Sequence, residues 1–250
     1  IHSISSAGTL TGTYAVAGQP TSLALDHKLN VWVAPITGEV YKYSSSGTLL
    51  LTVFTPGIGV FGIAVDGAGD IWAADGRASR TWKISPAGTI LLTLSYPAHR
   101  IPVVDHNDNI FTTGFGNGNA RKYAYDGTLL GTYPTPGFTS HQGMAVDRED
   151  NVWMTAQGTS VLKMSNTGTV LGSFASGGTI VVSAIVDGLG DIWVCNHGSG
   201  NVTHMKPDGT RVGGLIRVGP NPFVFGDGSG FQRAVFTDPF GDVDMDGHRN

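Results

Sequence analysis

The stretch GIAVDGAGDIWAADGRASRTWKISPAGTILLTL (residues 62–94) contains four short apolar runs separated by Gly, Asp, Ser and Pro. Runs of this length that are rich in β-branched and aromatic residues indicate β-strands. Asp66 can close a turn by accepting backbone N–H bonds, and Gly88 can supply the positive φ that a tight turn requires. The stretch therefore predicts four antiparallel strands, with turns at Asp66 and Gly88 joining the first pair and the last pair.

The same pattern occurs five times along the chain, and its turn aspartates follow one another at steps of 39 to 42 residues. These aspartates are Asp26, Asp66, Asp105, Asp147 and Asp187. A period near 40 residues with four strands per unit is typical of a β-propeller, in which each unit forms one blade of a ring.

The two ends of the chain predict a sixth blade. Residues 1–16 resemble the third and fourth strands of a unit, with Gly8 at the turn, and residues 221–236 resemble the first and second strands. A blade built from both ends closes the ring and removes open sheet edges. We therefore expect an all-β, six-bladed propeller of four-stranded antiparallel blades over residues 1–237, followed by an extension over residues 238–250.

Two further positions recur in every unit. An aromatic residue in the second strand is expected to pack between neighbouring blades, because it holds the same place in each repeat. These residues are Trp32, Trp72, Phe111, Trp153 and Trp193. A basic residue in the third strand is expected to be solvated or to bond a turn. These residues are Lys42, Lys83, Lys122, Lys163 and His204.

The composition argues against several classes of protein. Charged residues make up 14% of the chain, the net charge is -4 and no basic cluster occurs, so we do not expect nucleic acid as a partner. Apolar residues make up 40%, which is enough for a core and makes disorder improbable. The single Cys195 cannot form an internal disulfide. No run of about 18 apolar residues predicts a membrane span.

Function is expected where the units differ, in the loops after the second strand and in the connections between blades. In propellers these loops line one mouth of the central channel. The polar residues there that could bind a ligand are Arg77, Arg100, Asn117, Gln157 and Asn196.

Three residues of the same loops could carry acid–base chemistry. His141 and His197 come from adjacent units and could converge, and Asp75 could supply a carboxylate. Such a set could transfer protons or bind a metal ion. The alternative is that both histidines simply face solvent. The sequence contains no phosphate loop, no Gly-x-Ser-x-Gly and no His-Glu-x-x-His motif.

The C-terminal stretch DVDMDGHRN (residues 242–250) has the spacing of a calcium-binding loop. In an EF-type loop, alternate oxygen ligands surround a glycine turn. The expected ligands are Asp242, Asp244, Asp246, His248 through its carbonyl, and Asn250. The twelfth position of such a loop would lie beyond Asn250, so we expect weak affinity unless another segment supplies that ligand. The alternative is a polar terminus that binds no metal.

The repeats resemble a known group of proteins. AVDGAGDIWAAD (64–75) and NVWMTAQGTSVLKMSNTGTVLGSF (151–174) are similar to NHL-repeat and streptogramin-lyase-like propellers of bacteria, and the resemblance covers about residues 20–215. The lyases of that group use histidines, a carboxylate and a divalent metal ion at the channel mouth. In the loops after the second strand, only Asp75 and His197 have suitable chemistry. The tail resembles the beginning of a dockerin or thrombospondin type-3 calcium repeat.

These features favour a non-catalytic, extracellular or cell-surface propeller that acts as a structural or protein-interaction module. A specific form is self-assembly into a filament or array, through head-to-tail contacts or exchange of terminal strands. The first alternative is a metal-dependent carbon–oxygen lyase or lactonase-like enzyme that uses the two histidines and the carboxylate of the mouth. The second alternative is a carbohydrate-binding propeller, for which the available aromatic residues are Tyr96, Phe115 and Phe138.

Overall fold

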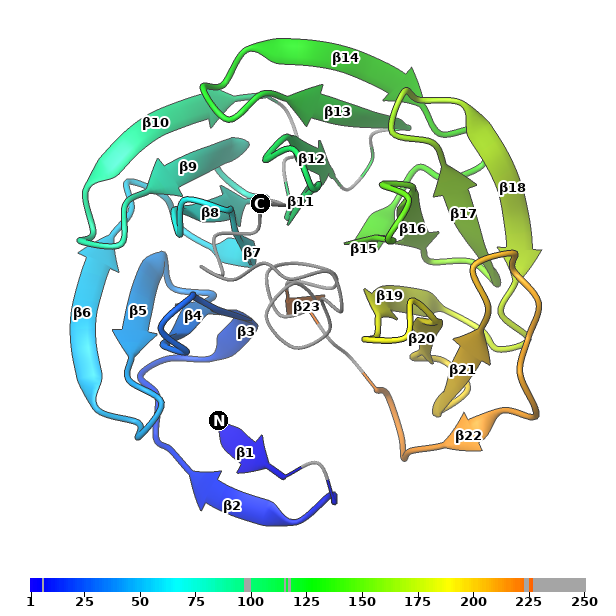
Figure 1. Cartoon of the computed structure of the whole chain (residues 1–250), viewed down its shortest axis with the longest axis horizontal. Helices are drawn as coiled ribbons and strands as arrows, with labels where there is room; N and C mark the ends of the chain where they lie inside the picture. Colours follow the sequence, from blue (N-terminus) through cyan, green and yellow to red (C-terminus); the bar gives the residue numbers. More distant parts are fainter. Residues whose placement is uncertain (6, 97–99, 115, 117, 223–224, 227–250) are drawn as a thin grey trace.

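Five blades of antiparallel strands are arranged around a common centre (Figure 1). The structure, a computed structural model, describes residues 1–5, 7–96, 100–114, 116, 118–222 and 225–226. Within each blade the strands are hydrogen-bonded in chain order, and the first strand lies nearest the centre of the ring (Figure 1). The prediction of an all-β propeller with four-stranded antiparallel blades is confirmed.

Blades one, two and four have the same strand lengths, whereas the first two strands of blade three and the last strand of blade five are shorter. Blade one contains β3 (Pro20–Leu25), β4 (Val31–Pro35), β5 (Glu39–Tyr43) and β6 (Leu49–Phe54). Blade two contains β7 (Val60–Val65), β8 (Ile71–Asp75), β9 (Arg80–Ile84) and β10 (Ile90–Ser95). Blade three contains β11 (Ile101–Val104), β12 (Ile110–Thr113), β13 (Asn119–Tyr123) and β14 (Leu129–Pro134). Blade four contains β15 (His141–Val146), β16 (Val152–Ala156), β17 (Ser160–Met164) and β18 (Val170–Ala175). Blade five contains β19 (Val181–Val186), β20 (Ile192–Asn196), β21 (Asn201–Met205) and β22 (Ile216–Arg217).

The N-terminal segment forms a separate two-stranded sheet of β1 (His2–Ile4) and β2 (Leu10–Thr13). It lies in the ring between blades five and one, with β2 at the rim, as third and fourth strands of a blade would (Figure 1). Most of residues 221–236, expected to supply the first and second strands, lies outside the described residues. Its short strand β23 (Phe225–Gly226) differs from that expectation, because it pairs in parallel with the free inner edge of β3. The proposed boundary at residue 237 also lies outside the described residues and remains a prediction.

The hydrophobic core lies between the blades. One cluster joins Trp32 and Val40 of blade one to Val60 and Ile63 of blade two. The recurring aromatic residues are fully buried in blades one to four, as expected from their repetition, and Trp193 of blade five is half-buried. Because each blade covers its neighbour, the repeats stabilise one another rather than folding as separate units.

The face of the ring that carries the turns between first and second strands, here called the turn face, has a repeated polar arrangement. In blade four, the Asp147 carboxylate accepts hydrogen bonds from the backbone N–H of Asn151 (2.8 Å) and from Nε1 of Trp153 (2.8 Å). The Lys163 ammonium lies 3.2 Å from Oδ2 of the same carboxylate. The turn aspartate thus fixes its own turn, a core tryptophan and a lysine together.

Of the two alternatives expected for the recurring lysines, the structure shows that they bond turns and are not solvated. In blades one to four their ammonium groups lie 3.1–3.2 Å from the turn aspartate of the same blade. Each also donates a hydrogen bond to the next blade, as Lys163 does to the carbonyl of Pro207 (2.7 Å). The sequence pattern did not reveal this role, because the acceptors lie 42 to 44 residues away along the chain.

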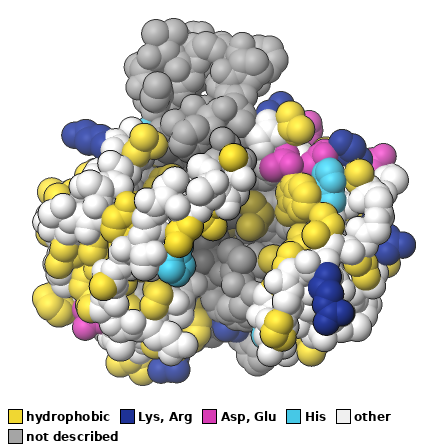
Figure 2. Space-filling view, turned by 90° about the horizontal axis from the view of Figure 1, so that it is seen from below, with side chains coloured by type: hydrophobic (Ala, Val, Ile, Leu, Met, Phe, Trp, Pro, Cys, Tyr) yellow, Lys and Arg dark blue, Asp and Glu magenta, His cyan; other side chains and the backbone are white. Residues whose placement is uncertain are grey.

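The outer surface of the ring exposes many aliphatic side chains (Figure 2). Pairs at the start of the outermost strands, such as Leu129–Leu130 in β14 and Val170–Leu171 in β18, are 40–50% exposed. Among the described residues, no helix has the length and apolar character that a membrane span requires.

Candidate functional site

The mouth face, opposite the turn face, carries the loops after the second strands and the connections between blades. Because neighbouring strands are antiparallel, the end of a second strand and the start of a first strand meet there. Asp75 at the end of β8, Asn196 at the end of β20 and His141 at the start of β15 therefore lie on this face, as predicted.

Asp75 is completely buried and its carboxylate is used by the backbone. Oδ2 accepts hydrogen bonds from the N–H groups of Ile58 (2.7 Å) and Gly59 (3.0 Å). Oδ1 accepts hydrogen bonds from the N–H groups of Arg77 (2.8 Å) and Ala78 (2.9 Å). Four backbone donors give this carboxylate a structural role, because it ties the connection before β7 to the loop after β8.

Asn196 is also completely buried, and it stays within its own blade. Its Nδ2 donates hydrogen bonds to Oδ1 of Asn201 and to Oγ1 of Thr203, both at 2.8 Å. Gln157, by contrast, is exposed at the mouth. Of these two predicted ligand-binding residues, only Gln157 presents its amide to solvent.

The two histidines lie on the mouth face of adjacent blades, in different environments. His141 is completely buried, and its Nδ1 lies 3.4 Å from the carbonyl oxygen of Gly114. His197 is half-buried, and its backbone N–H bonds the carbonyl of Ile180 (2.9 Å). The expectation that both face solvent is therefore wrong for His141.

Arg77 and Arg100 come together on one aromatic ring. The guanidinium carbon of Arg100 lies 4.7 Å from the ring centre of Phe61, and that of Arg77 lies 5.8 Å from the same point. Phe61 belongs to β7, Arg77 to the loop after β8, and Arg100 precedes β11 of the next blade. Phe61 was not among the residues singled out from the sequence, because nothing local distinguishes it from a core residue.

Several predicted residues lie outside the described part of the structure. They are Asn117, Phe115 and the tail residues Asp242, Asp244, Asp246, His248 and Asn250. The other aromatic candidates for a carbohydrate site are engaged, since Phe138 is buried and the Tyr96 ring lies 2.9 Å from the guanidinium carbon of Arg121.

A divalent metal ion at the mouth, as in the lyases that the repeats resemble, does not fit the described residues. Asp75 would have to give up backbone hydrogen bonds to ligate it, and His141 is buried against Gly114. Carboxylates and imidazoles bind metals through lone pairs that face the ion. We therefore derive no metal-dependent step from these residues.

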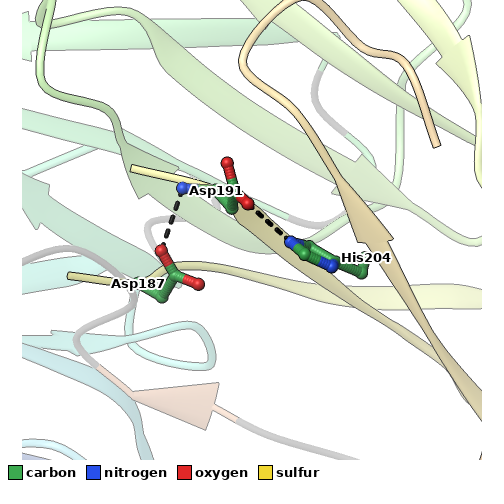
Figure 3. A group of neighbouring side chains, drawn as sticks. All are labelled: Asp187, Asp191 and His204. Atoms are coloured by element: carbon green, nitrogen blue, oxygen red, sulfur yellow. Dashed lines mark hydrogen bonds and ion pairs between the residues drawn. The ribbon is translucent and has the colours of Figure 1, made fainter. Parts of the chain in front are cut away.

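On the turn face, one group of metal-ligating residues comes together in blade five (Figure 3). One ligand atom from each of Asp187, Asp191 and His204 lies within 4.8 Å of the others. His204 stands where the other blades have lysine. Its ring stacks on Trp193 at 4.3 Å, and its Nε2 lies 2.7 Å from Oδ2 of Asp191. Because the Asp187 carboxylate caps the turn and bonds Trp193, as the turn aspartates bond the tryptophans of blades one, two and four, this group is a variant of the repeated structural motif.

Replacing Asp191 by asparagine should lower stability near neutral pH and have no effect in strong acid. Burial alone would raise the pKa of Asp191, but the Lys206 ammonium and His204 outweigh burial and hold that pKa below its usual value. A carboxyl with a lowered pKa stabilises the fold above its unfolded pKa of about 3.9 and loses this contribution as the pH falls through its folded pKa. Urea unfolding at several pH values measures the difference between the two proteins.

Asparagine holds the equivalent position in three other blades, as Asn30, Asn109 and Asn151, so the substitution fits the turn. A stability difference that stayed constant down to the lowest pH would contradict this assignment.

Several solved structures have a fold similar to that of this chain. A streptogramin B lyase structure aligns with a TM-score of 0.74 and 16% identity, over 90% of this chain and 78% of the lyase. A catalytically inactive virginiamycin B lyase from Staphylococcus aureus, solved with quinupristin, aligns with a TM-score of 0.74 and 14% identity, over 86% of this chain and 76% of the lyase. A protein of unknown function from Bacteroides caccae aligns with a TM-score of 0.66 and 13% identity, over 84% and 86% of the two chains.

No protein-family model and no curated protein sequence matches this chain. At identities of 13–16%, similarity of structure carries information about the fold and not about chemistry. The structural comparisons therefore show that this chain has the β-propeller fold of the streptogramin B lyases.

Proposed function

We propose that this protein is a non-catalytic β-propeller that acts as a protein-interaction module outside the cell or at its surface. The proposal rests on the burial and the hydrogen bonds of Asp75, the one carboxylate predicted for a catalytic role. It is completely buried and accepts four backbone hydrogen bonds. A general acid or base must reach the proton that it transfers. Neither Asp75 nor the buried His141 meets this requirement.

Self-association is the form of interaction that we favour. The outermost strands expose repeated aliphatic pairs, and each has one edge without a strand partner among the described residues. Exposed apolar surface and free strand edges both promote contacts between copies. We propose that copies associate head-to-tail or by exchange of their terminal strands. Calcium bound by the tail from Asp242 to Asn250 would stiffen the junction.

Two measurements test the proposal. The protein should leave quinupristin unchanged when the two are incubated with magnesium or manganese and analysed by liquid chromatography with tandem mass spectrometry, which distinguishes a ring-opened product of the same mass. Light scattering across a concentration series, with calcium and with a chelator, should show a rising mass. A mass that stays monomeric at every concentration in both conditions would overturn self-association.

The second candidate is a lyase, which the fold of the streptogramin B lyases favours. A ring-opened quinupristin product, lost in His197→Ala and in His141→Ala, would establish this candidate in place of the first. Both variants should keep the circular dichroism spectrum and melting temperature of the parent protein if the loss is to be assigned to chemistry.

A further inference from the structure

The carboxylate of the turn aspartate meets a cation in four of the five blades. In blades one to four, the ammonium of the recurring lysine lies 3.1–3.2 Å from Oδ2 of this aspartate. In blade five the turn aspartate is Asp187, and His204 stands at the lysine position. No ion pair within the described residues includes Asp187. The described part of blade five thus has the carboxylate of the motif without its cation.

Oδ2 of Asp187 can accept a positive partner without losing a hydrogen bond. Among the described residues it accepts one hydrogen bond, from Nε1 of Trp193 (2.7 Å). In blades one, two and four the same oxygen accepts the tryptophan N–H and also lies 3.2 Å from the lysine ammonium. A carboxylate oxygen has two lone pairs, so both partners fit. Asp75 differs, because each of its oxygens already accepts two backbone N–H groups.

Blade two shows where a cation lies when the turn carries a second carboxylate. Asp66 and Asp70 hold the positions of Asp187 and Asp191. The Lys83 ammonium lies 3.2 Å from Oδ2 of Asp66 and 3.2 Å from Oδ2 of Asp70. Two carboxylates that share a site repel each other, and a cation between them offsets this repulsion. Blade five repeats the two carboxylates but replaces the ammonium by an imidazole, which ligates metal ions in its neutral form.

The ligand atoms of blade five are close enough to share one ion (Figure 3). One ligand atom from each of Asp187, Asp191 and His204 lies within 4.8 Å of the others. Ligands in a tetrahedral zinc site, each about 2.0–2.2 Å from the ion, lie about 3.3–3.6 Å apart. The imidazole is held in place by Trp193, since the two rings stack with an angle of 3° between their planes. Small movements of the two carboxylates therefore complete the site.

Two neighbouring basic residues affect the charge of this group. The Lys206 ammonium lies 2.7 Å from Oδ2 of Asp191, and the Lys206 side chain is 51% exposed. An exposed ion pair contributes little free energy, so a divalent ion can displace this ammonium. Arg148 of blade four donates a hydrogen bond to the carbonyl of Gly188 in the same turn. Within the described residues it forms no ion pair with either carboxylate.

We propose that Asp187, Asp191 and His204 bind one divalent transition-metal ion, with zinc as the representative, on the turn face of blade five. Imidazole nitrogen together with carboxylate oxygen is a ligand set of zinc, whereas magnesium and calcium take oxygen ligands. His204 would bind through the lone pair of Nε2, with its proton on Nδ1, so the ion replaces the hydrogen bond to Asp191. The ion would join the turn between β19 and β20 to β21, as lysine does in the other blades. This inference does not depend on the proposed function.

The test is calorimetric titration of the full chain with zinc, magnesium and calcium chloride, together with two-dimensional NMR of the histidine ring nitrogens. We expect one zinc ion per chain to shift the Nε2 signal of His204 in a saturable way. Magnesium and calcium should leave that signal unchanged. Zinc that shifts the His204 signal no more than the signal of the exposed His2 would overturn the proposal.

Variants of the three ligands make the assignment specific. Asp191→Asn and His204→Gln should each weaken zinc binding by at least about tenfold, the loss that removal of an outer-shell partner alone can cause. His204→Lys restores the residue of the other blades, so it should abolish zinc binding and keep the melting temperature of the metal-free parent. Lys206→Met removes a competing ammonium and should strengthen binding. Weaker binding in Lys206→Met, or unchanged binding in His204→Lys, would overturn the site.

Matched controls exclude general charge attraction. Asp70→Asn removes the same charge at the same turn position of blade two, where a lysine supplies the cation, and should change zinc affinity less than twofold. The double variant Asp242→Asn and Asp244→Asn, in the tail, should also change it less than twofold. Losses in Asp70→Asn as large as those in Asp191→Asn would overturn the site.

The outcomes for the two proposals are independent. A protein that remains monomeric but binds zinc at His204 would overturn only self-association. A protein that self-associates but shows no zinc-dependent shift of His204 would overturn only this inference.

Discussion

Replacing Asp147 by alanine should destabilise the protein by about 3–5 kcal/mol, the usual result of leaving one partner of a buried ion pair alone. Asp147 is completely buried. Its loss leaves Nε1 of Trp153 and the backbone N–H of Asn151 without their acceptor. It also removes the counter-charge of Lys163, which lies 3.2 Å away and links blade four to blade five. Urea unfolding followed by tryptophan fluorescence measures the change.

A double variant and a surface variant control this result. Asp147→Asn combined with Lys163→Met should be less destabilised than the sum of the two single variants, because no unpaired charge remains. Asp126→Ala removes a turn aspartate whose carboxylate accepts the N–H of Thr128 at an exposed site, and its effect should be much smaller. A loss for Asp147→Ala no larger than that for Asp126→Ala would contradict the role assigned to the turn motif.

Replacing Gly168 by alanine should cost about 2–5 kcal/mol, the sum of a left-handed backbone and an overpacked contact. Gly168 has φ of +90°, and a Cβ built there would overlap the ring of Tyr133 in blade three. Gly168 therefore has two structural roles. It allows the chain to turn between β17 and β18, and it leaves room for the ring of Tyr133 from the previous blade to lie against the turn. Thermal and urea unfolding measure the cost.

Gly137→Ala is the matched control. Gly137 has φ of +80°, and a Cβ there would have no heavy atom within 4 Å. It should therefore cost about 1–2 kcal/mol, the backbone contribution alone. Equal effects at the two positions would mean that the contact with Tyr133 contributes nothing.

The polar residues of the mouth show the limit of prediction from sequence. Asp75, Asn196 and His141 were predicted as functional because they are polar, stand in loops and differ between repeats. All three are completely buried, and Asp75 and Asn196 are held by hydrogen bonds within the fold. The donors to Asp75 Oδ2 come from residues 58 and 59, in the connection between blades one and two. No local sequence pattern predicts that Asp75 accepts hydrogen bonds from this connection.

What the sequence by itself determined is the repeated unit: its four strands, its turns and the aromatic residues of the core. These follow from short-range physics, because Asp and Gly act on their own turn and apolar alternation selects the buried face of each strand. Only the tertiary structure decided which polar residues remain available to bind a ligand or to transfer a proton. Three findings depend on how one blade packs against another. The lysines donate hydrogen bonds to the next blade, the carboxylate of Asp75 accepts hydrogen bonds from the backbone, and Arg77 and Arg100 lie on the ring of Phe61. Those contacts join groups distant in the chain, so packing, and not local sequence, determines them.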